Sequence, residues 1–200
     1  IRMGTLYLGP KHDLSKIQGK DTNYDQIAHF LAARKTVAIF QGRSEAGPRA
    51  LGNRSILYDP RDPNGKDVVN KIKRRESFRP FAASILQAEA SSWFDMAGMY
   101  ESPYMMYAVD SLPDVRKLIP AVLHVDHTCR IQTVTSSQNF HFFYLITAFY
   151  NITEVPMIFN TSFNLAGDPL VESPRDAIDT FMKTELDYLY FPEVQKVISK

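Results

Sequence analysis

The sequence predicts an α/β or α+β fold, a mixed, twisted sheet flanked by helices. Short runs rich in β-branched and aromatic residues alternate irregularly with helical patterns, and no segment repeats. The 200 residues, 44% hydrophobic and 22% charged, are enough for one domain with an ordinary core, with or without a small extension. No apolar run reaches the length that a membrane-spanning helix needs, so we expect no membrane partner.

In the first half of the chain, Thr22 followed by Asp25 matches a capping box and predicts a helix over residues 23–34. A second helix is expected to begin at Asp62 and Pro63, because proline is tolerated in the first helical position. Lys66, Lys73 and Arg74 of this helix can point outward. Strands are expected at residues 5–8, 36–40, 55–58 and 81–86, and a short helix at residues 87–94.

In the second half, the almost wholly apolar run at residues 139–150 predicts a helix that is buried on most of its faces. Ser173, Pro174 and Asp176 mark the start of another helix, since they supply a capping hydroxyl, a first-turn proline and an acid. That helix is expected to end near residue 183. Strands are expected at residues 104–109, 122–134, 156–159 and 187–191.

Positive charge is concentrated in residues 41–81, which hold ten basic and five acidic residues, whereas the whole chain has a net charge of only +1. Arginine predominates in the loops, which suits bidentate binding of phosphate or carboxylate oxygens. Gly42, Gly47 and Gly52 recur every five residues and would let the backbone approach a ligand closely. The segment therefore predicts an anion site, with a solvated basic face as the alternative.

The segment HVDHTCR at residues 124–130 invites a zinc interpretation. On a regular strand, however, His124 and His127 would face opposite sides, which favours structural or substrate-facing roles. Arg130, near the middle of this expected strand, needs a partner, and a bound anion would serve. Cys129 is the only cysteine, which excludes an intramolecular disulfide and fits a reducing cytoplasm. As a nucleophile it is a weak candidate, because no neighbour in the sequence would lower its pKa.

The segment FNTSFN offers uncharged hydrogen-bonding groups from Asn160, Ser162 and Asn164. These suit an amide, a carbamoyl group or a ribose, although the same residues form turns without any ligand. The chain has no GxxxxGK[ST] phosphate loop, no dinucleotide fingerprint and no nucleophile elbow. The residues alone thus predict an anion-binding domain, for a nucleotide or an acyl phosphate.

Four segments in the same order resemble the C-terminal domain of the nodulation and antibiotic O-carbamoyltransferases. They read GRSEAGPRALGNRSIL, IKRRESFRPFAASIL, HVDHTCRIQTV and FNTSFNLAGDPLVESPRDAI, and the resemblance covers about residues 8–191. The chain departs from the family pattern at Ala46, where an aromatic residue is frequent, and at His127 and Cys129, where Gly and Ala are usual.

The resemblance implies a fold similar to the threonylcarbamoyl-AMP synthases. It also implies that this domain makes carbamoyl-adenylate from carbamoyl phosphate and ATP, with Mg²⁺ accompanying ATP as substrate. An N-terminal actin-like domain with a bound metal would then pass the carbamoyl group to an acceptor hydroxyl. On this interpretation residues 1–20 are the junction tail of that missing domain and residues 21–200 are the C-terminal domain, which is expected to hold no metal of its own.

Catalysis of this reaction would rely on positive side chains that stabilise the phosphate charges and position the reactants. Arg43 and Arg61 could equally be surface charges, and Arg74 is expected in solvent or at the domain junction. The alternative function is a non-catalytic nucleotide- or RNA-binding module, but the near-neutral net charge makes nucleic acid an unlikely partner. The expected catalytic residues are Arg49, Arg54, Lys73 and Arg75, and the expected substrate- or nucleotide-binding residues are Arg79, Arg130, Asn160, Ser162 and Asn164.

Overall fold

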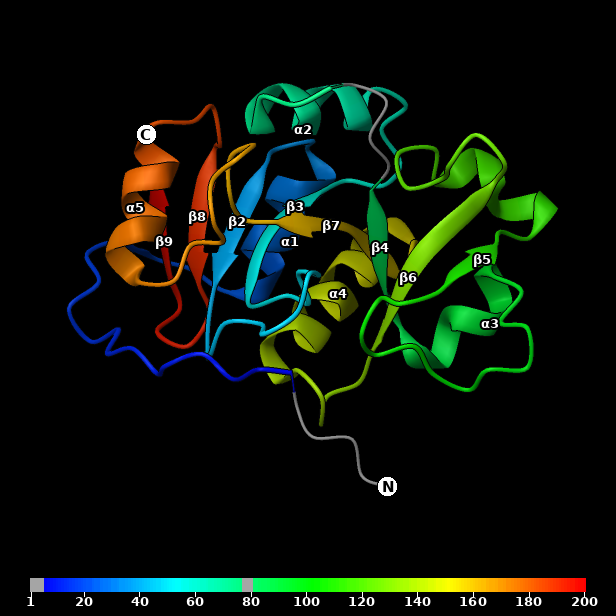
Figure 1. Ribbon diagram of the computed structural model, residues 1–200, viewed down its shortest axis with the longest axis horizontal. Coiled ribbons are helices and arrows are strands. Elements are labelled where there is room, and N and C mark those ends of the chain that lie inside the picture. The colour runs from blue at the N-terminus through cyan, green and yellow to red at the C-terminus, as the bar shows by residue number, and fades with distance from the viewer. Residues whose placement is uncertain (1–5, 77–80) are drawn as a thin grey trace.

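The computed structural model describes residues 6–76 and 81–200, whose strands form one mixed sheet in the order β1-β9-β8-β2-β3-β7-β4-β6-β5 (Figure 1). The pairs β2–β8 and β4–β6 are parallel and the other neighbours are antiparallel. The predicted mixed sheet is therefore confirmed. The strands are β1 Lys20–Asp21, β2 Val37–Phe40, β3 Arg54–Tyr58, β4 Ala82–Leu86, β5 Ala108–Asp110, β6 Thr128–Val134, β7 Met157–Ser162, β8 Tyr188–Phe191 and β9 Lys196–Ser199.

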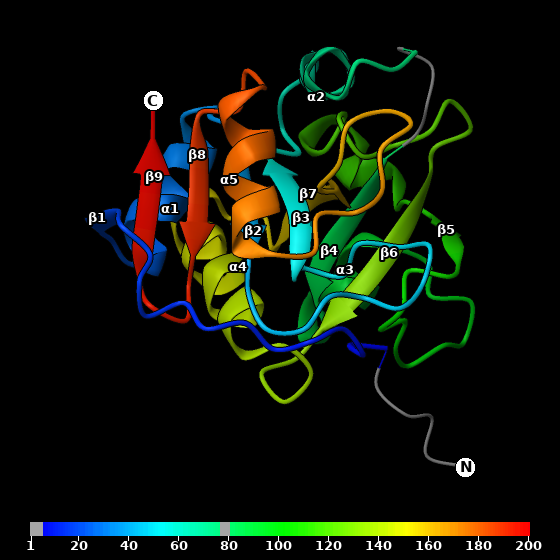
Figure 2. The same ribbon diagram turned by 60° about the vertical axis from the view of Figure 1, so that its left-hand side comes forward.

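Helices cover both faces of this sheet. Figure 2 shows α5 in front of the sheet and α1 and α4 behind it. α2 lies beyond the end of the central strands (Figure 1). The α-helices are α1 Tyr24–Ala32, α2 Gly65–Lys73, α3 Ala90–Trp93, α4 Phe140–Thr153 and α5 Pro174–Met182, and the 3₁₀ turns are η1 Gln87–Glu89 and η2 Pro113–Leu118.

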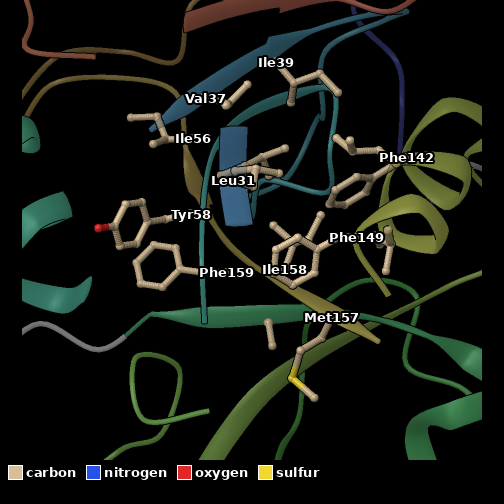
Figure 3. Close-up of a cluster of buried hydrophobic side chains, with 14 of the residues drawn as sticks. Leu31, Val37, Ile39, Ile56, Tyr58, Phe142, Phe149, Met157, Ile158 and Phe159 are labelled. Atoms are coloured by element: carbon tan, nitrogen blue, oxygen red, sulfur yellow. The ribbon is translucent and has the colours of Figure 1, made fainter. Parts of the chain in front are cut away.

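The main core lies between the central strands and the helix pair α1 and α4 (Figure 3). Leu31 from α1, Ile39 from β2 and Phe149 from α4 are fully buried there. Burial of such side chains contributes roughly 1.5–3 kcal/mol each. Helix α4 is less enclosed than its composition predicts, because Phe140 and Tyr144 lie on its solvent side with 56% and 40% exposure.

The long strand expected at residues 122–134 is half that length, because a turn precedes β6. His127 has a left-handed backbone with φ of 66°, and its N–H donates to the carbonyl of His124 at 3.0 Å. This hydrogen bond closes the turn, so that the strand begins only at Thr128. His124 and His127 therefore do not belong to one regular strand.

Two predicted helix starts are displaced. Asn23, not Thr22, caps α1, since its side chain accepts a hydrogen bond from the N–H of Gln26 at 2.8 Å. Helix α2 begins at Gly65, two residues after Pro63. The predicted start of α5 is confirmed, and Ser173 and Asp176 form a capping box in which each accepts from the other's backbone N–H.

The chain before β1 is packed onto the domain. Leu14 is 6% exposed and belongs to the main core. Where a strand was expected at residues 5–8, the described part contributes one antiparallel bridge, between Tyr7 and Glu45. The boundary at residue 20 stays a prediction. Over the described ranges, no helix is long and apolar enough to cross a bilayer.

Candidate active site

A cavity of about 190 Å³ opens where β4, β6 and β7 lie side by side. The sheet register explains its composition, because Ala82 of β4 is the Cα partner of both Arg130 on β6 and Asn160 on β7. The small Ala82 side chain leaves room between the two longer ones. Five of the predicted site residues line this cavity: Arg49, Arg75, Arg130, Asn160 and Ser162.

A second hollow of about 580 Å³ adjoins the first, and Arg75 and Ser162 line both. Lys73 and Asn164 line only the second. Segments that are distant in the sequence therefore form two neighbouring compartments with a shared wall. Arg79 lies outside the described residues.

Lys73 is buried between the end of α2 and the end of β7, although we expected it to point outward. It is 2% exposed, and its Nζ donates to the Ser162 carbonyl at 2.5 Å, to Ser162 Oγ at 3.1 Å and to Asn164 Oδ1 at 3.0 Å. Burial, and then repulsion from Arg75, lower the pKa of Lys73 to about 7. An anion bound nearby would favour its charged form.

The backbone at the end of α2 brings Arg75 to the shared wall. Arg74 caps the helix in a left-handed conformation with φ of 56° and lies exposed, in agreement with its expected solvated position. Arg75 then donates from Nε to Asn70 Oδ1 at 2.6 Å. Its guanidinium centre lies 4.3 Å from the centre of the Phe81 ring, and both residues line the cavity.

The cavity is strongly positive. Desolvation, and then the charge of Arg130, lower the pKa of Arg49. The Nε of Arg130 is buried and has no hydrogen-bond partner among the described residues. No carboxylate is found among the described residues that line this cavity. Such a site can hold a phosphate or carboxylate, which would satisfy the Arg130 donor and relieve the repulsion.

Asn160 adds an uncharged group to the same wall. It is 1% exposed, and its Nδ2 donates to the Ala50 carbonyl at 3.2 Å and to Ser84 Oγ at 2.9 Å. Its Oδ1 has no partner among the described residues. Ser162 and Asn164 bond to each other, from Oγ to Oδ1 at 2.7 Å, and both accept from the buried lysine amine described above.

Arg54 requires a correction, because it lies in the interior and does not line either hollow. Its Nη1 donates to the Gln41 carbonyl at 2.6 Å, and its Nη2 to the Gly42 carbonyl at 3.3 Å and the Glu172 carbonyl at 3.2 Å. The guanidinium centre lies 3.6 Å from the centre of the Phe40 ring. Arg54 therefore stabilises the loop between β2 and β3, and direct contact with a substrate does not fit its position.

Sequence reasoning missed Glu45, which organises the same loop from inside. It is 6% exposed, and its Oε1 accepts from the N–H groups of Leu51 at 2.8 Å, Asn53 at 2.9 Å and Arg54 at 3.4 Å. Desolvation by burial raises the pKa of this carboxyl group. The available signal was that Glu45 is the only acid in the loop sequence at residues 41–53, since an isolated carboxylate among loop N–H groups often caps them.

The remaining candidates divide between the cavity and the framework. His124 lines the cavity, with Nε2 3.3 Å from the Phe81 carbonyl. Cys129 is fully buried, and burial raises its pKa to about 12, so it cannot serve as a nucleophile. Arg43 is exposed, while Arg61 pairs with Asp59 at 2.7 Å. Across the residues described, no three His, Cys, Asp or Glu side chains gather as a possible metal site.

Comparison with protein families gives the decisive observation. A family model described as "Carbamoyltransferase C-terminus" matches residues 28–197. The chain belongs to this family. The nodulation protein NolNO of Sinorhizobium fredii is 44% identical over 176 residues, which cover 87% of this chain and 26% of the relative. The domain spans between 26% and 36% of the length of three curated relatives that it matches.

Solved structures show the same fold at low sequence identity. A full-length HypF in its phosphate- and nucleotide-bound form has a TM-score of 0.59 at 15% identity, covering 87% of this chain and 24% of HypF. A variant of Sua5 from P. abyssi has a TM-score of 0.54 at 15% identity, covering 84% of this chain and 52% of Sua5. The carbamoyltransferase C-terminal domain therefore has a threonylcarbamoyl-AMP synthase-like fold, as the resemblance implied.

Proposed function

We propose that this domain makes carbamoyl-adenylate from carbamoyl phosphate and ATP. Carbamoyl phosphate first reacts with water to give carbamate and phosphate. A carbamate oxygen then attacks the α-phosphorus of ATP, the bond to the β-phosphate oxygen breaks, and pyrophosphate leaves. The single observation that carries this proposal is the convergence of Arg49, Arg75 and Arg130 on a cavity whose described lining holds no acid.

The two compartments match two substrates of different size. The cavity of about 190 Å³ suits a small acyl phosphate, and the hollow of about 580 Å³ is in the range of sites for nucleotide-sized ligands. In this arrangement Arg75 and Ser162, on the shared wall, lie next to the reacting phosphorus. Mg²⁺ would enter with ATP as part of the substrate. The phosphate and nucleotide in the HypF structure support ligands of both kinds.

Each positive side chain acts mainly by electrostatic stabilisation. Arg49 and Arg130 neutralise the phosphate that leaves, and Arg75 neutralises the charge that develops at the α-phosphate. Lys73 holds Ser162 and Asn164 in place and supplies a further positive charge once it is protonated. The uncharged groups of Asn160, Ser162 and Asn164 orient the carbamoyl amide or the adenosine.

Transfer of the carbamoyl group to an acceptor hydroxyl is assigned to an upstream actin-like, metal-bearing domain of the same polypeptide. The curated relatives are about three times as long as this chain or longer, which supports a further domain. Both substrates are cytoplasmic metabolites, so we place the reaction in the cytoplasm.

The test is release of pyrophosphate from ATP by the purified chain with Mg²⁺. We expect release only when carbamoyl phosphate is also present. Arg130→Ala should lower the rate by about 100-fold or more, the usual effect of removing one preorganised donor. Arg43→Ala, which removes an exposed arginine outside the two hollows, should leave the rate unchanged.

Absence of pyrophosphate from a folded sample, with the upstream part of a relative added, would contradict the proposal. ATP binding without turnover in that experiment would instead indicate the nucleotide-binding module. Binding of RNA that weakens steeply with salt would indicate a nucleic-acid function.

A further inference from the structure

Three buried polar side chains on adjacent strands lie behind the cavity wall. Ser84 on β4, Gln132 on β6 and Asn160 on β7 are 0%, 2% and 1% exposed. The parallel register makes Ser84 and Gln132 Cα partners, and β7 lies on the other side of β4 (Figure 1). Polar groups buried so completely need hydrogen-bond partners within the protein. Their hydrogen bonds form a chain in which the donor and the acceptor of each bond are fixed.

The direction of that chain is set by a backbone carbonyl. The Leu51 carbonyl can only accept, and Gln132 Nε2 donates to it at 2.9 Å. This bond turns Gln132 Oε1 toward Ser84, whose Oγ donates to it at 2.7 Å. The single proton of Ser84 is then used, so Ser84 Oγ can only accept from its next neighbour.

That next neighbour is Asn160. Its Nδ2 donates to Ser84 Oγ at 2.9 Å and to the Ala50 carbonyl at 3.2 Å, and the Ala50 carbonyl independently requires a donor at this position. A flipped amide would place Oδ1 against two acceptors. The Asn160 amide is therefore held in one orientation. Its Oδ1 is buried in the wall of the cavity that Asn160 lines and has no partner among the described residues.

An unpartnered buried carbonyl oxygen favours a ligand that donates an N–H or O–H there. We propose that Asn160 Oδ1, held as an acceptor by Ser84 and Gln132, selects acyl phosphates whose acyl group carries an N–H donor. Asn160 is thus the specificity residue, and Ser84 and Gln132 are positioning residues. The inference rests on the proposed function, since it assumes that the cavity takes the acyl phosphate.

The arginines of the cavity cannot make this distinction. Carbamoyl phosphate and acetyl phosphate share the phosphate and the carbonyl oxygen, and they differ only in an amino group against a methyl group of similar size. A methyl group packed against Asn160 Oδ1 would exclude water and offer no hydrogen bond. We expect the amino compound to bind about tenfold more tightly or better, because the acceptor is satisfied only by the amino compound.

Two stable phosphonates test this selectivity without turnover. Phosphonoacetamide carries the amino group and acetonylphosphonate carries the methyl group, and both keep the charged end. Dissociation constants from isothermal titration calorimetry give their ratio for each variant, and inorganic phosphate reports the cationic part of the site separately. The wild-type chain should prefer phosphonoacetamide by about tenfold or more.

Asn160→Leu should abolish the preference while the affinity for inorganic phosphate stays within about threefold, since the cations are retained. Ser84→Ala keeps Asn160 but removes one of the two acceptors that orient its amide, and it should lower the preference while the phosphate affinity stays the same. Ser84→Ala also tests the inference if Asn160→Leu fails to fold. Ser102→Ala removes another buried hydroxyl, which donates to the Ile131 carbonyl outside this network, and should keep the wild-type ratio.

Equal binding of the two phosphonates by the wild type would overturn the inference and leave the proposed function standing. A wild-type ratio in Asn160→Leu would also overturn it. If Ser84→Ala alone kept the ratio, the positioning role would be overturned. Failure of the wild type to bind either phosphonate or inorganic phosphate would overturn the inference together with the proposed site.

Discussion

Anion binding to this domain should take up a proton, because Lys73 lies against the site. Burial, and then Arg75, lower the pKa of Lys73 to about 7, so we expect the neutral amine, which can donate to two of its three acceptors, to predominate at pH 8. An anion within about 4–6 Å raises the pKa of a lysine by about 1–3 units. With a rise of about two units, binding takes up about 0.8 proton at pH 8 and about 0.1 at pH 6.

The same shift sets the pH dependence of affinity. From a free pKa of about 7 and a bound pKa of about 9, we expect anion affinity to fall about tenfold between pH 6 and pH 8. Without the anion, folded Lys73 binds fewer protons than unfolded Lys73 between pH 7 and 10.5, so stability should rise with pH across that window. Over that whole pH window, the lowered pKa of Lys73 changes the free energy of unfolding by about 5 kcal/mol.

Calorimetry with sulfate measures the proton directly, because the charge of sulfate is constant over this range. The binding enthalpy should vary with the ionisation enthalpy of the buffer at pH 8 and hardly at all at pH 6. His124 lines the cavity too, so Lys73→Met is needed to assign the proton, and this variant should lose the buffer dependence. The reasoning would be refuted if the binding enthalpy of the wild type did not depend on the buffer at pH 8, or if Lys73→Met kept the wild-type dependence.

The remaining predictions concern the framework. Arg54→Ala should lower the free energy of unfolding by roughly 3–5 kcal/mol in urea, because buried carbonyls lose their donor, while Arg49→Ala should change it by less than about 0.5 kcal/mol; equal losses would contradict this contrast. Cys129 should resist a thiol reagent at pH 8 until the protein is unfolded, and rapid labelling of the native chain would show that its burial is wrong. Gly52→Ala should cost roughly 2–4 kcal/mol in thermal unfolding, because φ is 102° and the new Cβ would lie 2.2 Å from a ring carbon of Phe142. A neutral result there would mean that the loop can move aside.

The sheet and its main helices were predictable because their signals are local. The apolar run of α4 and the capping residues of α5 indicate their own structure within a few positions. The turn before β6 was not predictable, since it depends on a left-handed His127, which a periodicity argument does not anticipate. Strand β9 was missed because its short segment is only partly apolar and is defined by pairing with β8.

At the site, the charge of the sequence predicted an anion site but could not predict which way each side chain points. Arg49 and Arg54 looked equivalent in the sequence, yet one faces the cavity and the other lies among backbone carbonyls. Lys73 shows the same limit, because its burial depends on contacts with residues 162–164. The hydrogen-bond network behind Asn160 could not be predicted from the sequence either, because it depends on the register of three strands.

The loop between β2 and β3 is fastened before any ligand arrives. Inside, Glu45 accepts from the N–H groups of two loop residues and of Arg54 at the start of β3. Outside, the Ala46 N–H donates to the Leu6 carbonyl at 2.7 Å. Ordering five loose residues on binding would cost roughly 5–10 kcal/mol of conformational entropy, about the whole binding free energy of a micromolar ligand. A preorganised loop avoids that loss. We therefore expect that a small anion loses little binding free energy to loop ordering. Its association should resemble binding to a rigid surface and not coupled folding and binding.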